Sequence, residues 1–517
     1  MQKQQIMIGW VGLSLLYHFI FWGEKMGLNV GLYQAVTTLM LVKLYPSAFR
    51  SKSVQVATLF TWVATFMIIW HNSAISKFAY TTSFVVMIGF VHQPRLNAVF
   101  YGLLHSMHAL MITFIQGVQG VVALPKTSRL FNETTSRLAL RRARLVAIPL
   151  VIFLAFFAIF QIANPVFHQM TTQGIQAFGQ WLGQFSFYIS PTWIFFMLMG
   201  LWVSAFALFN WRKDDVLLLE QVKRTQLIRK KRMPKDRLLD FHMVSLKNEY
   251  RAGIITFAMV NALLLVVNSI DINFLWINFD YGRAGNLTKL VHQGTYLLIF
   301  SILLAMGIIL YFFRQNLNFY PQNRWLKRLA YVWIVQNAIL VISVGLRTWY
   351  YIDATGLAYK RIGVLIYLGL TLFGLFTMYR KIDRRKTTFY LWKTNSWAVY
   401  TMMILMTFVN WDRLIVSYNF NYNQHTGEFV LTRSVRTLDL LNNYIQKIPP
   451  KERKAIIRTY ALGGELLEIS KENFIEERAD EFLAEQNGYS WLSWNYGDWR
   501  TRWYLLAKEK RSMSSQN

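Results

Sequence analysis

The chain has 517 residues, of which 54% are hydrophobic and 16% are charged, and its formal net charge is +29. A soluble chain of this length is usually more polar and divides into several domains. The sequence contains no cysteine, which excludes disulfides, thiolate catalysis and cysteine-ligated metals. The basic charge would suggest nucleic acid in a soluble protein, but no nucleic-acid-binding motif interrupts the apolar segments, so we expect no nucleic-acid partner.

A series of long apolar segments with few or no charges runs along the chain. All but the last approach the roughly 20 residues that a membrane-spanning helix needs. The segments are Met7–Trp22, Val54–Trp70, Leu145–Ile162, Trp193–Phe209, Ile254–Ile270, Thr295–Phe313, Leu329–Leu346, Ile362–Tyr379 and the shorter Trp397–Val409. The sequence therefore predicts an all-α integral membrane protein, a polytopic helical bundle.

The loops between these segments differ in charge, and basic loops stay in the cytoplasm. The basic loops are Lys126–Arg144, Arg212–Arg251, Lys381–Lys386 and the weaker Arg314–Arg328. This placement makes Gln161–Phe187, Asp271–His292 and Arg347–Lys360 external, and the first of these has no Lys or Arg. The excess of basic residues also predicts contact with anionic lipid headgroups of the bilayer.

The N-terminal part contains two further candidate spans, Leu28–Leu44 and Ala74–Val91, and then the apolar segment Asn97–Leu124. In that last segment His105, His108, Gln116 and Gln119 recur at helical steps and form one polar stripe. A single polar stripe is typical of a helix that lies in the interface or against the bundle. We therefore expect about eleven spans, a cytoplasmic N-terminus and an extracytoplasmic C-terminus.

Two other segments have amphipathic patterns. Ala163–Phe185 carries glutamines on one side and apolar residues on the other, which predicts an interfacial helix on the outer face. The cytoplasmic loop 216–251 reads as two short amphipathic helices broken at Pro234. Its basic run Arg229–Arg232 suits headgroup anchoring, and a protein-binding site is the sharper alternative.

The chain divides into three predicted regions. Residues 1–144 form an N-terminal membrane region with four spans, an interfacial helix and a basic cytoplasmic loop. Residues 145–410 form a membrane core that includes the cytoplasmic basic loop 211–251. Residues 411–517 form an extracytoplasmic helical tail, the size of a small soluble domain.

Within the tail, the patterns predict helices over Val435–Ile445, from Lys451 to Ala461, and over the acidic stretch Lys471–Gln486. The stretch Tyr489–Tyr504 is rich in tryptophan and arginine. This composition fits an interaction surface, the tail's own small core or an interfacial aromatic belt. Partner proteins are therefore expected at 211–251 or 411–517.

The sequence contains no nucleotide-binding, kinase or metalloprotease motif. His105 and His108 have the spacing of metal ligands, but no acidic residue or third histidine nearby completes a site. We assign no catalytic residue, no cofactor and no metal ligand. The candidate intramembrane polar residues are Asn261, Gln336 and Asn337, which either bond between helices or line a polar path.

The densest constellation is the short connection Arg347–Arg361. One interpretation is a helical hairpin in which Gly356 makes the turn and the aromatic residues lie at headgroup level. The other is an anion or headgroup site formed by Arg347, Tyr351 and Arg361, since arginine binds carboxylate and phosphate through paired donors. Asp353 could pair with only one of the two arginines.

These residues resemble a bacterial polytopic membrane family of unknown function, numbered forty-one seventy-three, and its relative, numbered forty-one fifty-three. The stretches that carry the resemblance are Ile148–Phe167, which ends in Ala-Asn-Pro-Val-Phe, Val291–Tyr296, Arg347–Arg361 and Asn410–Asn419. It covers roughly residues 145–444, and more weakly the Trp-rich tail. Asn164, Ala358 and Trp411 stand where the family has Asp, Thr and Pro, which weakens the case for proton or ion chemistry there. The resemblance implies a topology and supplies no mechanism.

The function expected from these patterns is that of a non-enzymatic bacterial inner-membrane protein, an envelope scaffold, sensor or accessory subunit. The spans contain few acids, whereas ion-coupled transporters usually carry intramembrane carboxylates. The alternative is a transporter or channel for a small molecule or lipid, and a membrane enzyme is a third reading. A water-filled path lined by Asn261, Gln336 and Asn337 would favour transport, and a solid bundle with an external groove would favour binding.

Overall fold

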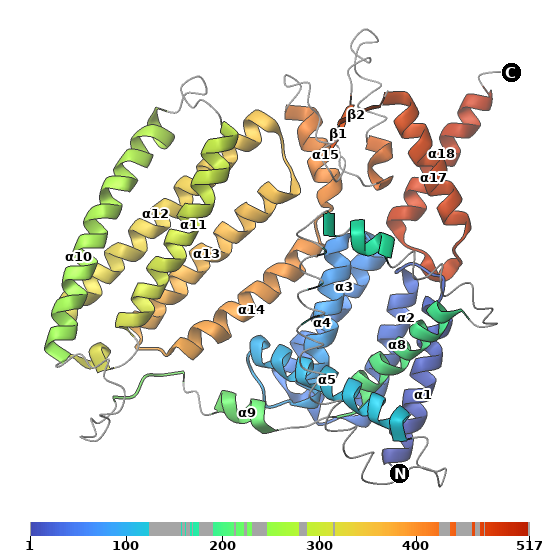
Figure 1. Ribbon diagram of the computed structural model, residues 1–517, viewed down its shortest axis with the longest axis horizontal. Coiled ribbons are helices and arrows are strands. Elements are labelled where there is room, and N and C mark those ends of the chain that lie inside the picture. Colours follow the sequence, from blue (N-terminus) through green and yellow to red (C-terminus); the bar gives the residue numbers. More distant parts are fainter. Residues whose placement is uncertain are drawn as a thin grey trace.

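The computed structural model describes most of the helical parts of the chain. The described residues are 2–123, 190–210, 214–221, 225–229, 246–278, 287–313, 316–422, 435–440, 457–460, 466–469 and 471–514, with scattered positions between 153 and 174. Two groups of helices stand side by side, and the C-terminal elements lie at one end of them (Figure 1). We call that end the cap end and the opposite end the base.

The N-terminal bundle is built from the first helices of the chain. They are α1 (Gln2–Phe21), α2 (Leu28–Leu44), α3 (Lys52–Trp70), α4 (Ala74–His92), α5 (Val99–Ala123) and α8 (Pro191–Leu208), with the short η1 (Ala48–Arg50) and α9 (Asp214–Gln221). One apolar cluster, which includes Leu13, Val30, Phe90 and Phe206, holds them together. Burying such side chains contributes about 1.5–3 kcal/mol each relative to water, and in a membrane close packing takes over this role.

A tight turn joins α3 to α4 at the cap end. Asn72 adopts a left-handed backbone conformation, with φ of 48°. Asparagine is one of the few side chains that tolerate this region. Ser73 follows as the N-cap of α4 and accepts a hydrogen bond from the Ser76 amide. The short segment between the helices therefore reverses the chain and leaves the Asn72 carbonyl facing the C-terminal elements, where Arg436 binds it.

The C-terminal bundle follows in the sequence. It consists of α10 (Leu246–Asp271), a π-helical extension of it, η3 (Ile272–Ile277), then α11 (Leu287–Phe312), η4 (Asn316–Phe319), α12 (Arg324–Thr355) and α13 (Tyr359–Asp383). A separate apolar cluster around Phe257, Phe313, Leu326 and Val344 forms its core. The buried Lys381 donates to the Phe313 carbonyl at 2.7 Å, at the end of α11 where helix carbonyls lack intrahelical partners.

Helix α14 (Thr388–Thr407) connects the two bundles. Its Leu391 belongs to the core of the C-terminal bundle, while Tyr400 and Ile404 belong to the core of the N-terminal bundle. The rings of Phe90 and Trp397 stack with centroids 6.0 Å apart. Beyond a bend of 67°, the chain continues as α15 (Trp411–Tyr422) towards the cap end.

The remaining C-terminal elements, together with α15, form what we call the cap. They are η5 (Val435–Thr437), β1 (Ile457–Tyr460), β2 (Leu466–Ile469), α17 (Lys471–Asn487), η6 (Trp491–Ser493) and α18 (Tyr496–Ser514). The strands pair in antiparallel register with Ile457 opposite Ile469. A small apolar cluster, formed mainly by Val416, Phe420, Leu438, Phe482 and Leu505, holds α15, α17 and α18 together.

The structure confirms the acidic helix of the tail as α17 and corrects the helix predicted from Lys451 to Ala461. That prediction is wrong in its described part, because residues 457–460 form strand β1. Ile457 and Thr459 are β-branched and Tyr460 is aromatic, and these residue types favour a strand over a helix once a partner strand is present. Of the helix predicted over Val435–Ile445, only residues 435–440 are described, and they are helical.

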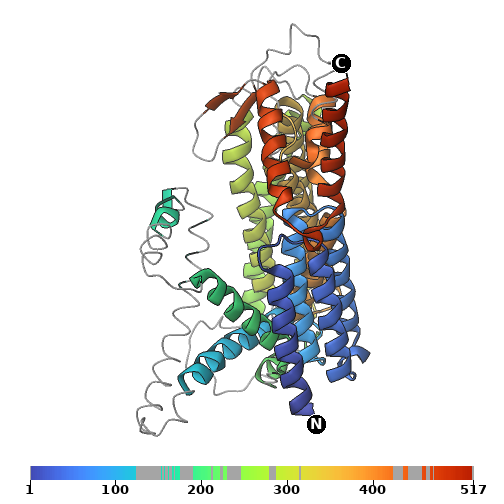
Figure 2. The ribbon, with the colours of Figure 1, turned by 90° about the vertical axis from the view of Figure 1, so that its right-hand side faces the viewer.

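The described part of the chain is a helical membrane protein. Seven of its helices are long and apolar enough to cross a bilayer, or eight if the bent pair α14–α15 is one span. Helices α2, α5 and α11 contain shorter apolar stretches. The N-terminus lies at the base and the C-terminus at the cap end (Figures 1 and 2), and α5 slants across the base of the N-terminal bundle.

Several predicted segments fall largely outside the described residues. Only scattered positions of Ala163–Phe185 are described, among them the helical residues 169–174. Leu145–Ile162 is described at three isolated positions. In the loop 216–251 the first predicted helix corresponds to α9, and residues 230–245 are outside the described part.

Candidate functional site

A polar seam joins α10 to α12 inside the C-terminal bundle. The Asn261 amide nitrogen donates to the Leu329 carbonyl at 3.0 Å, and the Asn268 amide nitrogen donates to the Gln336 carbonyl at 3.0 Å. Both partners advance by seven residues in the same direction, so the two helices run parallel with a repeat of two helical turns. The side chains of Asn261, Asn268 and Gln336 are buried.

The seam contains acceptors that no described residue satisfies. They are Asn261 Oδ1, Asn268 Oδ1 and Gln336 Oε1. Asn337 donates to the Trp333 carbonyl of its own helix at 2.7 Å. The three predicted intramembrane residues therefore lie on or beside one helix-to-helix contact, and the side-chain donors of Asn261 and Asn337 bind main-chain carbonyls.

A buried ion pair closes the seam at the cap end. Arg347 Nη2 lies 2.5 Å from Asp271 Oδ1, and the two side chains are 14% and 7% exposed. Just beyond it, the Trp276 indole donates to Ser343 Oγ at 3.1 Å and the Tyr350 hydroxyl donates to the Leu275 carbonyl at 2.8 Å. Both of these bonds involve the π-helical extension η3, a type of distortion often found at functional sites.

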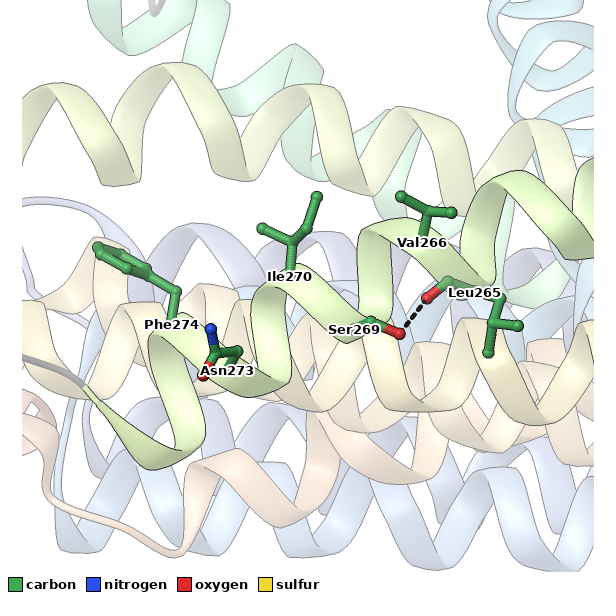
Figure 3. A pocket seen from close by; sticks show the side chains of 6 residues that line it. All are labelled: Leu265, Val266, Ser269, Ile270, Asn273 and Phe274. Atoms are coloured by element: carbon green, nitrogen blue, oxygen red, sulfur yellow. Dashed lines mark hydrogen bonds between the residues drawn. The ribbon is translucent and has the colours of Figure 1, made fainter.

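An external groove lies along the same helix. It has a volume of about 590 Å³ and is lined by Leu265, Val266, Ser269, Ile270, Asn273 and Phe274. Val266, Ile270 and Phe274 point to the same side of α10, and Ser269 donates to the Leu265 carbonyl at 2.8 Å (Figure 3). Leu265, Val266 and Ile270 are exposed, so the groove opens on the surface of the bundle and does not enter the polar seam.

The hairpin between α12 and α13 turns at Gly356, whose φ of +87° lies in the left-handed region that favours glycine. Asn419 of α15 holds the turn from both sides. The Leu357 amide donates to Asn419 Oδ1 at 2.5 Å, and Asn419 Nδ2 donates to the Leu357 carbonyl at 3.0 Å. Ile415 packs in one apolar cluster with Ile352 and Leu357, so the cap is fixed to the C-terminal bundle here.

The structure brings together two of the three residues of the predicted anion site. The Arg361 guanidinium lies over the Tyr351 ring, 4.2 Å from its centroid, and donates to the Gly356 carbonyl. Arg347 pairs with Asp271 of α10. The sequence pointed to Asp353 as the local acid, but the carboxylate that binds Arg347 comes from another helix.

Sequence reasoning missed Asn268, Asp271 and the clamping role of Asn419. Asn268 follows Asn261 by seven residues, a heptad step that could have indicated a shared helix face. The buried face of α10, which steps through Phe257, Asn261, Leu264, Asn268 and Asp271, follows this spacing. Asp271 sits where the apolar pattern ends, and the sequence therefore placed it in a loop.

The cap is also seated on the N-terminal bundle. The Glu24 carboxylate accepts hydrogen bonds from the Ser490 amide at 3.1 and 3.2 Å and from the Ser493 hydroxyl. The Lys25 amide donates to Ser493 Oγ at 2.8 Å, and the Leu28 amide donates to the Trp494 carbonyl at 2.9 Å. The turn between α1 and α2 thus forms hydrogen bonds at both ends of η6.

Gly27 permits this close approach. A Cβ atom added there would lie 2.4 Å from the Ser493 carbonyl oxygen and 2.6 Å from the Trp494 carbonyl oxygen. Backbone atoms cannot move aside as a side chain can, so any larger residue separates the two segments. The Asn29 side chain fixes the same turn, because its Oδ1 accepts from the Gly27 amide at 2.8 Å.

A second contact joins the cap to the turn between α3 and α4. Arg436 Nη1 donates to the Asn72 carbonyl at 2.8 Å, and Arg436 Nε donates to Asp498 Oδ1 at 2.6 Å. Burial raises the pKa of Asp498, but the charge and hydrogen bond of Arg436 and the hydrogen bond from Asn495 outweigh it, so the pKa lies below its usual value. The carboxylate therefore stays ionised within the contact.

The tryptophans of the tail do not form its core. Trp491, Trp494, Trp499 and Trp503 are all exposed, whereas the cap core is made of aliphatic and phenylalanine side chains. This excludes one of the three interpretations of the Trp-rich stretch. Among the described residues no group of three or more His, Asp or Glu side chains is arranged to hold a metal ion.

Comparison with known proteins gives one match. The model of a family described as "Domain of unknown function (DUF4153)" matches residues 40–459, which include most of both bundles and part of the cap. No curated protein and no solved structure matches the chain. The match is to the relative that the resemblance placed second; it does not support the number forty-one seventy-three, and it extends well to the N-terminal side of residue 145.

Proposed function

The chain belongs to the DUF4153 family, and from its geometry we propose that it is a non-enzymatic inner-membrane scaffold, sensor or accessory subunit of the bacterial envelope. One observation carries the proposal: the cap is bound to the ends of both helical bundles. Residues 24–28 and Asn72 hold it on one side, and Leu357 holds it on the other. A binding module fixed in this way presents a constant surface to a partner.

The interior of the membrane region supports binding over transport. The amide donors of Asn261, Asn268 and Asn337 are used by main-chain carbonyls, and the groove on α10 opens outward. A transport path needs polar groups that face a continuous water-filled cavity. An external groove on α10 is the arrangement that the binding reading predicts.

The proposed topology has a cytoplasmic base, an extracytoplasmic cap and about eleven spans. The shorter apolar helices α2 and α11, the bent α14 and the largely undescribed segment Leu145–Ile162 would add to the seven long apolar helices. Among the described residues, Arg324 and Arg328 at the start of α12 and Arg384 and Arg385 after the end of α13 lie at the base. There the Leu227 amide donates to the Arg385 carbonyl at 2.9 Å, which ties the basic loop to the turn between α13 and α14.

We keep the anion or headgroup site at the cap end as part of this proposal. Arg361 and Tyr351 form its core, because the guanidinium over the ring retains donors that a phosphate could bind. Arg347 contributes by holding α10 against α12. Replacing both Arg347 and Arg361 by Ala should reduce function, and a well-folded double variant with full function would remove this part of the proposal.

The scaffold proposal is tested by comparing the proteins that co-purify with three forms of the full chain from the native membrane. The forms are the wild type, Gly27→Val, which should unseat the cap, and the control Gly12→Ala, whose added Cβ meets nothing within 4 Å. We expect the control to retain the wild-type set and Gly27→Val to lose members of it. Identical sets for all three forms, or no co-purified protein, would contradict the proposal.

A transporter or channel is the second candidate, and the Asp271–Arg347 pair favours it. Both residues lie in helices that can span a bilayer, and intramembrane ion pairs often mark ion pathways. Vesicles containing the purified chain and a pH-sensitive dye would reveal proton flux. Proton flux that is present in the wild type and lost in Asp271→Asn would establish this candidate. The absence of flux in both forms would favour the scaffold proposal instead.

A further inference from the structure

A strip of aromatic rings runs without a break from the membrane helix α3 onto the cap helix α18. The rings of Phe66 and Trp70 stack with centroids 5.9 Å apart, those of Trp70 and Tyr496 with centroids 4.5 Å apart, and those of Tyr496 and Trp499 lie 5.9 Å apart. Trp503 follows Trp499 by one helical turn and extends the strip along α18. We call these five residues the aromatic strip.

Most of the aromatic strip is exposed. Phe66 is 54%, Trp499 50% and Trp503 66% exposed, and Leu506 continues the same face of α18 at 41%. Lipid accounts for the part on α3, where Leu59 and Trp62 extend the exposed face into the membrane helix. It does not account for the part on α18, which rises away from the bundles at the cap end (Figures 1 and 2).

The part of the strip on α18 extends well beyond the end of the membrane helix α3. A helix rises about 1.5 Å per residue, so Trp503 lies roughly 10 Å and Leu506 roughly 15 Å along α18 from Tyr496. Tyr496 itself contacts Trp70 at the end of α3. Large exposed apolar side chains at this distance from a membrane span mark a site of protein contact, and tryptophan and arginine are the residues that contribute most to such contacts.

A protein that covers the aromatic strip must therefore have apolar surface in two places, one beside the membrane helix α3 and one beside the cap helix α18. The charges of the cap indicate which occupant this is. Helix α18 exposes Arg502 and also Arg500, which pairs with Asp439 of the same cap at 3.1 Å, while α17 exposes Asp480 and Glu481. A surface that carries both a basic and an acidic helix is complementary to a second copy of itself, related by a two-fold axis.

We propose that the aromatic strip is the contact between two copies of this chain, with the two-fold axis parallel to α18. Each copy places Trp499 and Trp503 against the strip of the other, and the basic face of one α18 lies beside the acidic α17 of its partner. The contact buries the exposed tryptophans that neither the cap core nor the N-terminal bundle covers. This inference goes beyond the proposed function, because a cap seated on one chain does not require a dimer.

The absence of cysteine from the sequence makes a direct test available. In native membranes, the single substitution Trp503→Cys should give a disulfide-linked dimer of twice the 60.8 kDa chain mass under mild oxidation, and reduction should reverse it. Trp491→Cys is the matched control, since Trp491 is 65% exposed but lies on η6 and not on α18. We expect at least a tenfold difference in dimer yield between the two.

No dimer with Trp503→Cys, or equal yields at both positions, would overturn the proposal, because equal yields report random collision. A second measurement does not depend on cysteine chemistry. The mass of the detergent-solubilised chain should fall from two copies to one in Trp499→Ala/Trp503→Ala and stay at two copies in Trp491→Ala. A monomeric wild type, with only lipid or a different protein on the strip, would also overturn it. Either failure leaves the seating of the cap untouched.

Discussion

The two helical bundles bury their polar groups in different ways. In the N-terminal bundle neutral aromatic side chains reach the carbonyls of α8: the Trp10 indole donates to Leu201 at 2.8 Å and the Tyr45 hydroxyl donates to Leu208 at 2.7 Å. In the C-terminal bundle amides and the Asp271–Arg347 ion pair join α10 to α12. The N-terminal bundle also buries the Glu220 carboxylate, which the Asn97 main-chain amide binds, whereas the C-terminal bundle pairs two buried side chains of opposite charge.

The two bundles are therefore vulnerable at different places. The loss of a neutral donor removes a hydrogen bond between uncharged groups, whereas the loss of one member of an ion pair leaves an uncompensated buried charge. In the N-terminal bundle the polar contacts that matter most lie at the cap end, where residues 24–28 and Asn72 bind the cap.

Removing one member of the ion pair should have the largest effect. We expect Asp271→Ala to lower the free energy of unfolding by about 3–5 kcal/mol, because Arg347 is then buried without a partner. The double variant Asp271→Ala/Arg347→Ala should lose less than the sum of the two single variants. Unfolding by denaturing detergent in mixed micelles measures this, and a single-variant loss below about 1 kcal/mol would contradict a buried pair.

Removing Arg436 should reverse the pH dependence of cap seating. In the wild type the lowered pKa of Asp498 means that its carboxylate stabilises the contact at neutral pH, and this contribution is lost only as the pH falls below the ordinary value of 3.8. In Arg436→Ala the burial that raises the pKa is still opposed by the Asn495 hydrogen bond and the charge of Lys25 but no longer by Arg436, the largest opposing influence, so the pKa should rise. The contact should then be weakest at neutral pH, by about 1.5–3 kcal/mol, and recover on acidification.

Hydrogen exchange of residues 490–503 between pH 4 and pH 8 measures this contact. We expect protection to be flat across this range in the wild type and to rise towards low pH in Arg436→Ala. Parallel profiles in the two forms would show that Arg436 does not set the charge of Asp498.

Substitution of Gly27 should weaken only the binding of the cap to the N-terminal bundle. Gly27→Val places side-chain atoms against the carbonyls of Ser493 and Trp494 and should cost about 1–3 kcal/mol of the docking free energy. Limited proteolysis of the tail reports the loss of seating. Gly12→Ala should leave the cleavage rate unchanged, and an unchanged rate in Gly27→Val as well would mean that the α1–α2 turn does not bind η6.

The smallest effect should come from the amide seam. Asn268→Leu removes the bond to the Gln336 carbonyl together with the unsatisfied Asn268 Oδ1. Interhelical bonds in membranes contribute about 0.6 kcal/mol on average, so the loss should be near that value. The same detergent titration measures it. A loss approaching that of Asp271→Ala would mean that the seam, and not the ion pair, holds α10 to α12.

The sequence predicted the helical membrane character well because apolar length is a local property. Each predicted apolar segment that is described lies in or overlaps one of the helices, and Gly356 makes the predicted turn. The strand at Ile457–Tyr460 was missed because it requires a partner strand at Leu466–Ile469, which the helical pattern of its own neighbours concealed.

The candidate site could be predicted only in part. The pattern Arg347–Arg361 identified Tyr351 and Arg361, which lie within one hairpin and therefore meet. The partner of Arg347 could not be predicted, because Asp271 is 76 residues away and the contact depends on which helices pack together. The seating of Ser490–Trp494 on Glu24–Leu28 is more distant still, and nothing in either segment alone indicates the other.

Chemical cross-linking can show directly whether the cap is seated on the N-terminal bundle. Lys25 Nζ contacts Glu485 Oε1 across this contact. In the cysteine-free chain, the pair Lys25→Cys/Glu485→Cys can be treated in native membranes with a short, membrane-impermeant bis-maleimide reagent. We predict rapid linkage of the two positions within one chain, detected as a joined peptide by mass spectrometry and reduced when Gly27→Val is added. Two separately modified cysteines with no joined peptide would contradict the account.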